Sequence, residues 1–261
     1  MQPLELVNSI KKKAFVFHDK SWKHEDEYHY HYKAQLMYVE SGYQYLHTEN
    51  NHFLLPQNHI AWIPSNMPHK TNTSSELISL RTLYFDIEST DPYYKELHIF
   101  SAPEVLKQMI LYSEKWSLVE AYNPSEAIFL DAILSELPSF TQNAIPIKIP
   151  IPTHPKLLQI TKYIDNHYNN SIVISEVAKD HLLSTRTLER LFKKETGITL
   201  AKYLQMVKII KSIELLSEGN LTVNEVAYQV GYNSVQSYSN VFMKLIGKRP
   251  SEFLKVDNLL K

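Results

Sequence analysis

The sequence predicts a multidomain chain in which a β-rich domain precedes an all-α domain. Three observations predict this fold class: prolines interrupt the chain near residue 150, four of the five glycines follow them, and nine of the twelve histidines precede them. A domain mostly contains about 100 to 200 residues, so 261 residues favour two domains. We expect a first domain at 1–144, a linker at 145–155 and a second domain at 156–261.

The prolines define the linker. Four of them lie in residues 145–155. Each proline fixes its own φ angle and lacks the amide hydrogen that a helix or a sheet needs, and the residue before it is restricted to extended conformations. The segment is therefore expected to be an extended, semi-rigid connection.

The first domain begins as β structure. Polar and apolar residues alternate in segments 35–40 and 59–63, which predicts half-buried strands. The β region is expected to end near Asp86, with amphipathic helices following at 103–112 and 125–137. We expect these helices to pack on their own sheet, or in addition to form a subunit interface. Their apolar residues at helical spacing are Val105, Met109, Tyr112, Ile128, Ala132 and Leu137.

The composition excludes several classes of protein. Hydrophobic residues make up 44% and charged residues 21% of the chain, and no apolar run approaches the roughly 20 residues that span a bilayer. Cysteine is absent, so the chain has no disulfide and no thiolate metal site. An apolar patch at 4–10 precedes three lysines, the reverse of a secretory signal. We expect a cytoplasmic protein without membrane contact.

Charge is divided unevenly along the chain. Residues 1–151 contain 12 Lys and Arg against 18 Asp and Glu, a net −6, whereas residues 152–261 contain 15 against 10, a net +5. Such a division indicates a polyanion-binding half joined to a half that does not bind polyanions. The alternative is an ordinary solvated surface, because a charge of this size is common.

An internal repeat of about fifty residues is the strongest pattern in the sequence. The segment 176–178 recurs at 225–227, which is 49 positions later. Further residues recur 50 positions later: Ser184, Phe192, Lys194, Gly197 and Tyr203 correspond to Ser234, Phe242, Lys244, Gly247 and Phe253. The second copy therefore has one residue more than the first. The addition falls within 229–233, which corresponds to 180–183 of the first copy, where a helix-turn-helix has its turn.

Each copy has the parts of a helix-turn-helix unit. A short helix is expected at 175–181 and a second helix at 185–196, opened by a serine N-cap. In the second copy Thr222 and Glu225 form a capping box for the short helix, and the second helix is expected at 235–246.

A long helix is expected to join the two copies at 203–218, and another helix to precede them at 155–168. The joining helix should fix the two units relative to each other by burying one apolar stripe. Its stripe comprises Tyr203, Val207, Ile210, Ile213 and either Leu216 or Leu215.

The second helix of each copy leaves a polar face free. An α-helix fits the major groove of DNA, where arginine pairs with guanine, glutamate accepts from cytosine, amides suit adenine and lysine neutralises phosphate. A single such face is usually just a solvated surface, but two copies at matched spacing favour two recognition helices about 34 Å apart in adjacent major grooves. The candidate contacts are Arg186, Glu189, Arg190 and Lys193, and Val235, Gln236, Ser239 and Asn240.

Residues 155–261 resemble the AraC/XylS family of bacterial regulators, whose second unit ends in a pattern matched by segment 242–253. The resemblance implies base reading by the same candidate residues, except Lys193, and implies RNA polymerase as a partner. The sequence departs from the family at Lys208 and Ser212, where arginine and alanine are usual, and at Asn240, where arginine is frequent.

The segment 28–32 alternates tyrosine with histidine, so His29 and His31 share one face of a strand. Together with segment 64–69, this part of the sequence resembles the two cupin motifs. The resemblance implies a cupin-like β-barrel with two following helices, and it places His29, His31, Gln35 and His69 at metal-ligand positions. Glutamine replaces the usual glutamate and is a poorer ligand for a divalent cation, so no metal and no cofactor are assigned.

Two other interpretations of the histidines remain open. They are hydrogen bonded within the barrel, or they belong to a pocket for a small polar effector. The candidate pocket residues are His29, His31, Gln35, Tyr38, Trp62, His69 and Arg81. Arg81 is the sole arginine before the linker, which suits either a carboxylate ligand or a surface ion pair.

These observations predict a sequence-specific transcription factor and not an enzyme. We expect a homodimer that binds double-stranded DNA and responds to a small-molecule effector of its first domain. Two alternatives are a first domain that only dimerises, and a metal-dependent cupin enzyme fused to a DNA-binding domain. Gln35 argues against the enzyme.

Overall fold

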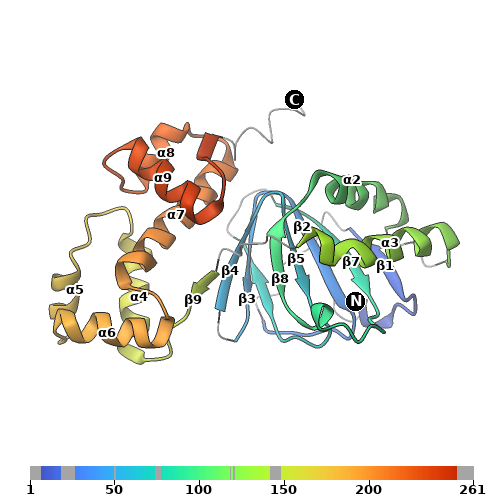
Figure 1. Ribbon diagram of the computed structural model, residues 1–261, viewed down its shortest axis with the longest axis horizontal. Coiled ribbons are helices and arrows are strands. Elements are labelled where there is room, and N and C mark those ends of the chain that lie inside the picture. Colours follow the sequence, from blue (N-terminus) through green and yellow to red (C-terminus); the bar gives the residue numbers. More distant parts are fainter. Residues whose placement is uncertain are drawn as a thin grey trace. The chain divides into compact units, whose positions relative to one another are not determined.

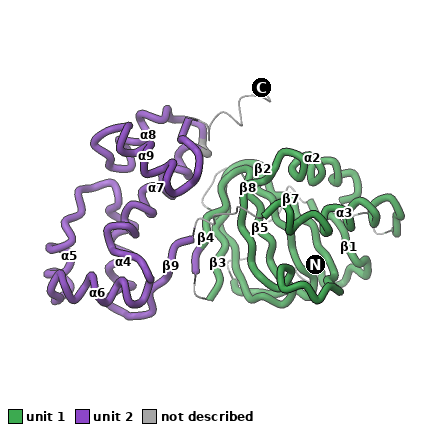
Figure 2. The backbone as a smooth tube through the Cα atoms, viewed as in Figure 1, with its two compact units in different colours: residues 1–49, 53–146 green, residues 50–52, 147–261 purple. Residues whose placement is uncertain are grey.

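The chain folds into two units, which Figure 2 draws in different colours. One unit holds residues 1–49 and 53–146, and the other holds residues 50–52 and 147–261. Strands dominate the first unit and helices the second, as the predicted fold class requires. The computed structural model describes residues 7–18, 27–49, 51–73, 78–117, 119, 121–141 and 148–251.

The larger sheet of the first unit has five strands in the order β1-β7-β2-β5-β8. All neighbouring strands are antiparallel, and Figure 1 shows them side by side. The strands are β1 (Ala14–Phe17), β2 (Ala34–Ser41), β5 (His59–Ile63), β7 (Ser79–Phe85) and β8 (His98–Ser101).

The β region does not end near Asp86, and that prediction is wrong. After a turn of 3-10 helix, η1 (Pro92–Lys95), the chain returns to the sheet as β8 and places Phe100 opposite Ile60 of β5. Strand β8 is only four residues long. A strand this short shows too little alternation to be recognised from sequence.

A second sheet contains β6 (Lys70–Asn72), β3 (Tyr43–His47) and β4 (Asn51–Pro56), in that order. One face of the five-stranded sheet packs against it. The shared core includes Met37, Val39, Ala61, Ile63, Leu46, Phe53 and Leu55. Side chains alternate between the two faces of a strand, so the neighbouring residues of β2 and β5 must be covered from the other side.

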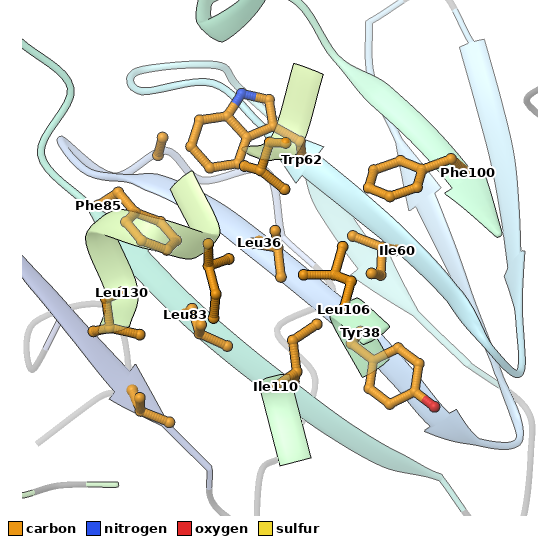
Figure 3. Close-up of a cluster of buried hydrophobic side chains, with 14 of the residues drawn as sticks. Leu36, Tyr38, Ile60, Trp62, Leu83, Phe85, Phe100, Leu106, Ile110 and Leu130 are labelled. Atoms are coloured by element: carbon orange, nitrogen blue, oxygen red, sulfur yellow. The ribbon is translucent and has the colours of Figure 1, made fainter. Parts of the chain in front are cut away.

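Helices α2 (Glu104–Ser113) and α3 (Pro124–Phe140) supply that cover, together with the 3-10 helix η2 (Glu114–Trp116). Figure 3 shows Leu36, Trp62 and Leu83 of the sheet beside side chains of the helices. The buried helix residues in this core are Leu106, Ile110, Trp116, Leu130, Ile133 and Leu137.

The expected apolar stripes of α2 and α3 are mostly on the wrong face. Val105, Tyr112 and Ile128 are exposed, as is Ala132, whereas Leu137 is buried and Met109 half-buried. Both helices carry apolar residues on two faces, and periodicity alone does not show which face meets the sheet. An exposed apolar face is therefore left over on this pair of helices.

Over residues 148–251, which the structure describes, the second unit consists of helices apart from one short strand. None of the helices that the structure describes is long and apolar enough to cross a membrane. The elements are β9 (Lys148–Pro150), α4 (Pro155–His167), α5 (Ile174–Asp180), α6 (Thr185–Thr196), α7 (Leu200–Glu218), α8 (Val223–Gln229) and α9 (Val235–Ile246).

The two predicted helix-turn-helix units are confirmed as α5–α6 and α8–α9. The side chain of Ser184 accepts a hydrogen bond from the Thr187 amide and begins α6, and Ser234 accepts from Ser237 and begins α9. The capping box at the start of α8 is also present. Of the residues in the repeat, Phe253 lies outside the described residues.

The structure locates the added residue of the second copy. The amide of Leu183 donates to the carbonyl of Ala178 at 2.9 Å, and the amide of Tyr232 donates to that of Ala227 at 3.0 Å. Both residues of the second pair stand 49 positions after the first, whereas the serine caps are 50 apart. The extra residue is therefore Asn233, which lies between the last matched hydrogen bond and the cap.

Helix α7 joins the two copies through one buried stripe, as predicted. Tyr203 and Val207 belong to the core of the first copy, which also contains Leu188 and Phe192 of α6. Farther along α7 the buried apolar residues are Ile209, Ile210, Ile213 and Leu216, and Ser212 and Glu214 are buried beside them. The question left open between Leu215 and Leu216 is settled in favour of Leu216.

The turn of the first copy offers a test of backbone strain. Leu182 has φ 55° and its side chain is 86% exposed, while the matching residue of the second copy is Gly231 at φ 80°. A left-handed conformation costs a non-glycine residue about 1 to 2 kcal/mol. Replacement by glycine removes this cost, but the greater conformational freedom of glycine in the unfolded chain offsets about 0.5 to 1 kcal/mol of the gain. We predict that Leu182→Gly raises the free energy of unfolding by up to about 1 kcal/mol.

The measurement is urea unfolding of the full chain followed by far-ultraviolet circular dichroism. Leu182→Ala is the matched control, since alanine keeps the Cβ atom and is expected to leave stability nearly unchanged. A Leu182→Gly chain that is less stable than Leu182→Ala would contradict the prediction.

Candidate nucleic-acid interface and histidine cluster

Helix α6 presents a charged face to solvent. Leu188 and Phe192 anchor the opposite face in the core. The four predicted contact residues of this helix are all exposed, namely Arg186, Glu189, Arg190 and Lys193. Three positive charges and one negative charge give this face a net +2, which suits a polyanion.

Helix α9 presents a neutral polar face at the matching place. Tyr238 and Phe242 are its buried anchors. Gln236 and Asn240 are exposed, while Val235 and Ser239 are half-buried. The amide nitrogen of Gln236 donates to Oδ1 of Asn240 at 3.0 Å, so these two amides are already joined one helical turn apart.

The two faces differ in charge although the backbones match. Gln236 stands where the first copy has Arg186, and Asn240 stands where it has Arg190. Met243, which is 45% exposed, replaces Lys193. Among the candidate contact residues, the cations therefore lie in the first copy and the hydrogen-bonding amides in the second, although α9 also has the exposed Lys244 in its last turn.

In the first unit the structure brings three histidines together. The backbones of His29 and His69 exchange two hydrogen bonds of 2.9 Å. Ring centroids are 4.5 Å apart for His29 and His69, 5.1 Å for His31 and His69, and 6.3 Å for His29 and His31. Gln35 joins the cluster, since its Oε1 lies 3.0 Å from Nε2 of His31.

Backbone carbonyls orient the rings of this histidine cluster. Nδ1 of His31 lies 2.5 Å from the carbonyl of Lys33, and Nδ1 of His69 lies 2.8 Å from that of Met67. Burial lowers the pKa of His31, and burial lowers the pKa of His69 to about 3. A neutral imidazole has one N–H, so the second contact of His31 is satisfied when Gln35 turns its amide nitrogen toward the ring.

The remaining predicted pocket residues lie elsewhere. Tyr38 and Trp62 are on the face of the sheet that α2 and α3 cover (Figure 3), whereas Gln35 is on the other face by alternation. The hydroxyl of Tyr38 donates to Oδ1 of Asn58 at 2.9 Å, and Nε1 of Trp62 donates to the carbonyl of Tyr94 at 3.3 Å. The structure does not bring these residues to the histidine cluster.

Arg81 also faces the helices and is bound by two carboxylates. Its Nε lies 3.0 Å from Glu40, and its Nη1 lies 2.5 Å from Glu114 at the start of η2. The arginine side chain is largely buried, whereas the side chains of Glu40 and Glu114 are 32% and 44% exposed, so the ion pairs join a buried cation to carboxylates at the surface. The guanidinium ties β7 to the strand and the helix that flank it.

The cluster does not fit the metal that a cupin fold implies. Among the residues that the structure describes, no group of three His, Asp or Glu side chains is arranged to hold a metal ion. The fourth member, Gln35, is neutral, and a divalent cation prefers a carboxylate. The donor set of this cluster therefore does not suit a divalent cation.

Comparison with known proteins identifies both units. A family model described as an AraC-like ligand binding domain matches residues 14–138, and one described as a helix-turn-helix domain matches residues 177–255. The chain belongs to the AraC/XylS family. The resemblance expected from the sequence is thereby confirmed for both halves of the chain.

Several relatives of this AraC/XylS family chain are named as regulators. The HTH-type transcriptional regulator NimR of Escherichia coli is 23% identical over 92% of this chain and 86% of its own length. The Msm operon regulatory protein of Streptococcus mutans is 31% identical over 37% of this chain and 35% of its own length. A solved structure, the C-terminal domain of AraT from Geobacillus stearothermophilus, is 28% identical over 40% of this chain and 86% of that domain, with a TM-score of 0.38.

Family membership connects the two polar helix faces with DNA. The chain is a DNA-binding transcription regulator with a ligand-binding domain, and α6 and α9 are the candidate recognition helices of its two units. The sequence marked Lys208 only as a departure from the family pattern, and it gave no sign of the contacts that Asn169 makes. Both residues approach Gly231, and they do so only in the folded unit.

The histidine cluster makes stability depend on pH. Folding lowers the pKa of His69 from 6.5 to about 3. Between these two pH values the imidazole is protonated in the unfolded chain and neutral in the folded chain. The free energy of unfolding is therefore highest above pH 6.5, and it decreases as the pH falls toward 3, because protons bind preferentially to the unfolded chain. We predict that acidification from pH 7 to pH 5 costs about 2 kcal/mol through His69 alone.

All three tryptophans lie in the first unit, so their fluorescence during urea unfolding at each pH reports on that unit. His69→Gln is expected to be less stable than the parent at pH 7 but to show a shallower loss between pH 7 and pH 5. The prediction fails if the two chains lose stability in parallel.

Proposed function

We propose that this AraC/XylS family chain reads two adjacent major grooves on one side of a DNA duplex with α6 and α9. The single observation that carries the proposal is the pair of exposed polar faces on two equivalent helices, both fixed to α7. Successive major grooves are about 34 Å apart. Two recognition helices on one chain therefore read two neighbouring short elements.

The residues of α6 have distinct roles. Arg186 and Arg190 can each fork onto O6 and N7 of a guanine, and Glu189 can accept from N4 of a cytosine. Lys193 lies toward the end of the helix and neutralises a phosphate, which contributes affinity without sequence preference. In α9 the contacts are neutral: Val235 meets a thymine methyl, and Gln236, Ser239 and Asn240 bond to base edges.

The first unit is proposed to sense a small-molecule effector. Its match to an AraC-like ligand binding domain supports this role, and the polar side chains of the histidine cluster are one place for the effector. A second place is an open cavity of about 400 Å³ between the segment before β1 and α3, a volume that suits a small molecule. It is lined by Lys11, Lys12, Lys13, Ala14, Tyr122, Asn123, Glu126, Ala127 and Asp131.

The proposal includes a homodimer formed through α2 and α3. Tyr112 is 58% exposed and Ile128 is 72% exposed, and Val105 lies two turns before Tyr112 on the same face of α2. Exposed apolar faces of this kind mark protein interfaces. The family resemblance further implies contact with RNA polymerase. The relatives reported above are named as regulators, which supports a regulator rather than a cupin enzyme.

The DNA-binding proposal is tested with the full chain and a random pool of duplexes. Enrichment of a motif with two separate elements, bound with an affinity that falls steeply as salt rises, is the expected result. The absence of salt-sensitive binding to any duplex would overturn the proposal.

Individual contacts can be separated by substitution. We predict that Arg186→Ala and Arg190→Ala each cost about 1 to 3 kcal/mol of binding free energy and relax the preference at one base pair. Lys193→Ala is expected to weaken binding to all sequences alike and to reduce the salt dependence. Competition binding against duplexes with single base changes measures both effects, and equal losses on all duplexes for all three variants would refute the assignment.

The dimer proposal predicts the effect of a charge on the exposed face of α3. Ile128→Asp is expected to shift the chain from dimer to monomer, since a buried and unpaired carboxylate costs several kcal/mol at an interface. Sedimentation velocity over a range of concentrations measures the shift. Tyr228→Asp, an exposed position on α8 of the second unit, is the matched control, and an unchanged dimer with Ile128→Asp would exclude this face.

A further inference from the structure

Besides α7, a second contact links the two copies: the segment after α4, a helix that packs in the core of the first copy, touches the turn of the second copy. Asn169 follows α4, on the side of the first copy, and Gly231 lies in the turn of the second copy. Their backbones approach so closely that a Cβ atom on Gly231 would lie 2.4 Å from the carbonyl oxygen of Asn169 and 2.9 Å from its carbonyl carbon. Only glycine fits such a contact without moving a backbone.

Lys208 of α7 stabilises the contact between Asn169 and Gly231. Its Nζ donates a hydrogen bond to the carbonyl of Gly231 at 2.8 Å and lies 5.6 Å from the centre of the Tyr232 ring. The same Nζ would be 2.9 Å from a Cβ on Gly231. The ammonium is half-buried, and burial lowers its pKa. A partly desolvated charge gains more from its carbonyl partner than an exposed one does.

The first copy shows that the glycine is needed for this contact and not for the turn itself. Leu182 adopts the same left-handed conformation at the matching position, with φ 55°, and its side chain is 86% exposed. The turn therefore tolerates a side chain that extends into solvent, even though Lys156 of α4 donates a hydrogen bond to the neighbouring carbonyl of His181 at 3.2 Å. Gly231 differs because Asn169 and Lys208 meet it.

The position of Lys208 on α7 gives the contact a mechanical role. Val207 is buried in the core of the first copy, while Ile209 and Ile210 begin the second stretch of buried α7 residues. Lys208 thus lies at the boundary between the two copies. A long helix on its own bends gently, but a helix braced by a second contact between the units it joins has less freedom to bend.

We propose that the junction of Asn169, Lys208 and Gly231 fixes the separation of α6 and α9 and thereby sets the spacing between the two DNA elements. Lys208 is a positioning residue, since it acts by holding the second helix-turn-helix copy in place and not by touching DNA. The inference rests on the two-groove binding proposed above. It adds that spacing, as well as base sequence, is read by the protein.

The test uses the full chain and the two-element duplex that it enriches from a random pool. Duplexes are then made with the elements moved apart or together by one and by two base pairs, and a dissociation constant is measured for each. The readout is the ratio of affinities for the best and the displaced duplex. Because both values come from one protein preparation, any inactive fraction cancels.

In Lys208→Met the apolar stem remains but the ammonium is lost. The spacing ratio is expected to fall about fivefold, within the range for substitutions that uncouple two sites. Lys208→Arg keeps a donor and should restore most of the ratio. Lys162→Met, which removes one exposed charge from α4, controls for charge alone and should keep the parental ratio. Gly231→Ala pushes the backbones apart and should also lower the ratio.

Three results would overturn the inference. An unchanged ratio in Lys208→Met would show that α7 alone sets the spacing. Loss of binding to every duplex by Lys208→Met would show that Lys208 is needed for binding as such. If the parental chain bound duplexes of every spacing equally well, the proposed two-groove binding would be wrong, and this inference with it. That result differs from an unchanged ratio in Lys208→Met, so failure of the proposed function can be distinguished from failure of this inference.

Discussion

The burial of one stripe on α7 is the constraint on which the second unit depends. Tyr203 and Val207 complete the core of the first copy, and Ile210, Ile213 and Leu216 continue the stripe toward the second. Full burial of a side chain of this size contributes about 1.5 to 3 kcal/mol. Neither short unit could bury enough apolar surface alone, so the folding of each copy and the placement of its recognition helix are coupled through this helix.

Local signals allowed most of the second unit to be predicted. The repeat, the serine caps and the capping box depend on residues a few positions apart, and the structure reproduces them within a residue or two. The candidate DNA contacts followed from the same logic, because the buried anchors Leu188 and Phe192 determine which face of α6 is left for solvent. Long-range packing has little influence on such features.

The first unit was harder to predict because sheets are made by distant segments. Alternation shows that Tyr38 and Gln35 point to opposite faces of β2, but it does not show which face the helices cover. Alternation alone separates Tyr38 from Gln35, whereas the positions of Trp62 and Arg81 depend on how β5 and β7 pair with β2, which no local pattern gives. Similarly, the contact of Asn169 with Gly231 joins residues far apart in sequence and leaves no periodic trace.

The unequal charge of α6 and α9 has a consequence for the order of events during association. Electrostatic attraction acts at a distance and raises the rate of encounter, whereas neutral hydrogen bonds act only at contact. In the binding mode proposed above, the cationic face of α6 is therefore the one that captures the duplex. In the same mode the amides of Gln236 and Asn240, already held together at 3.0 Å, lose little side-chain entropy when they engage afterwards, and they govern how long the complex lasts.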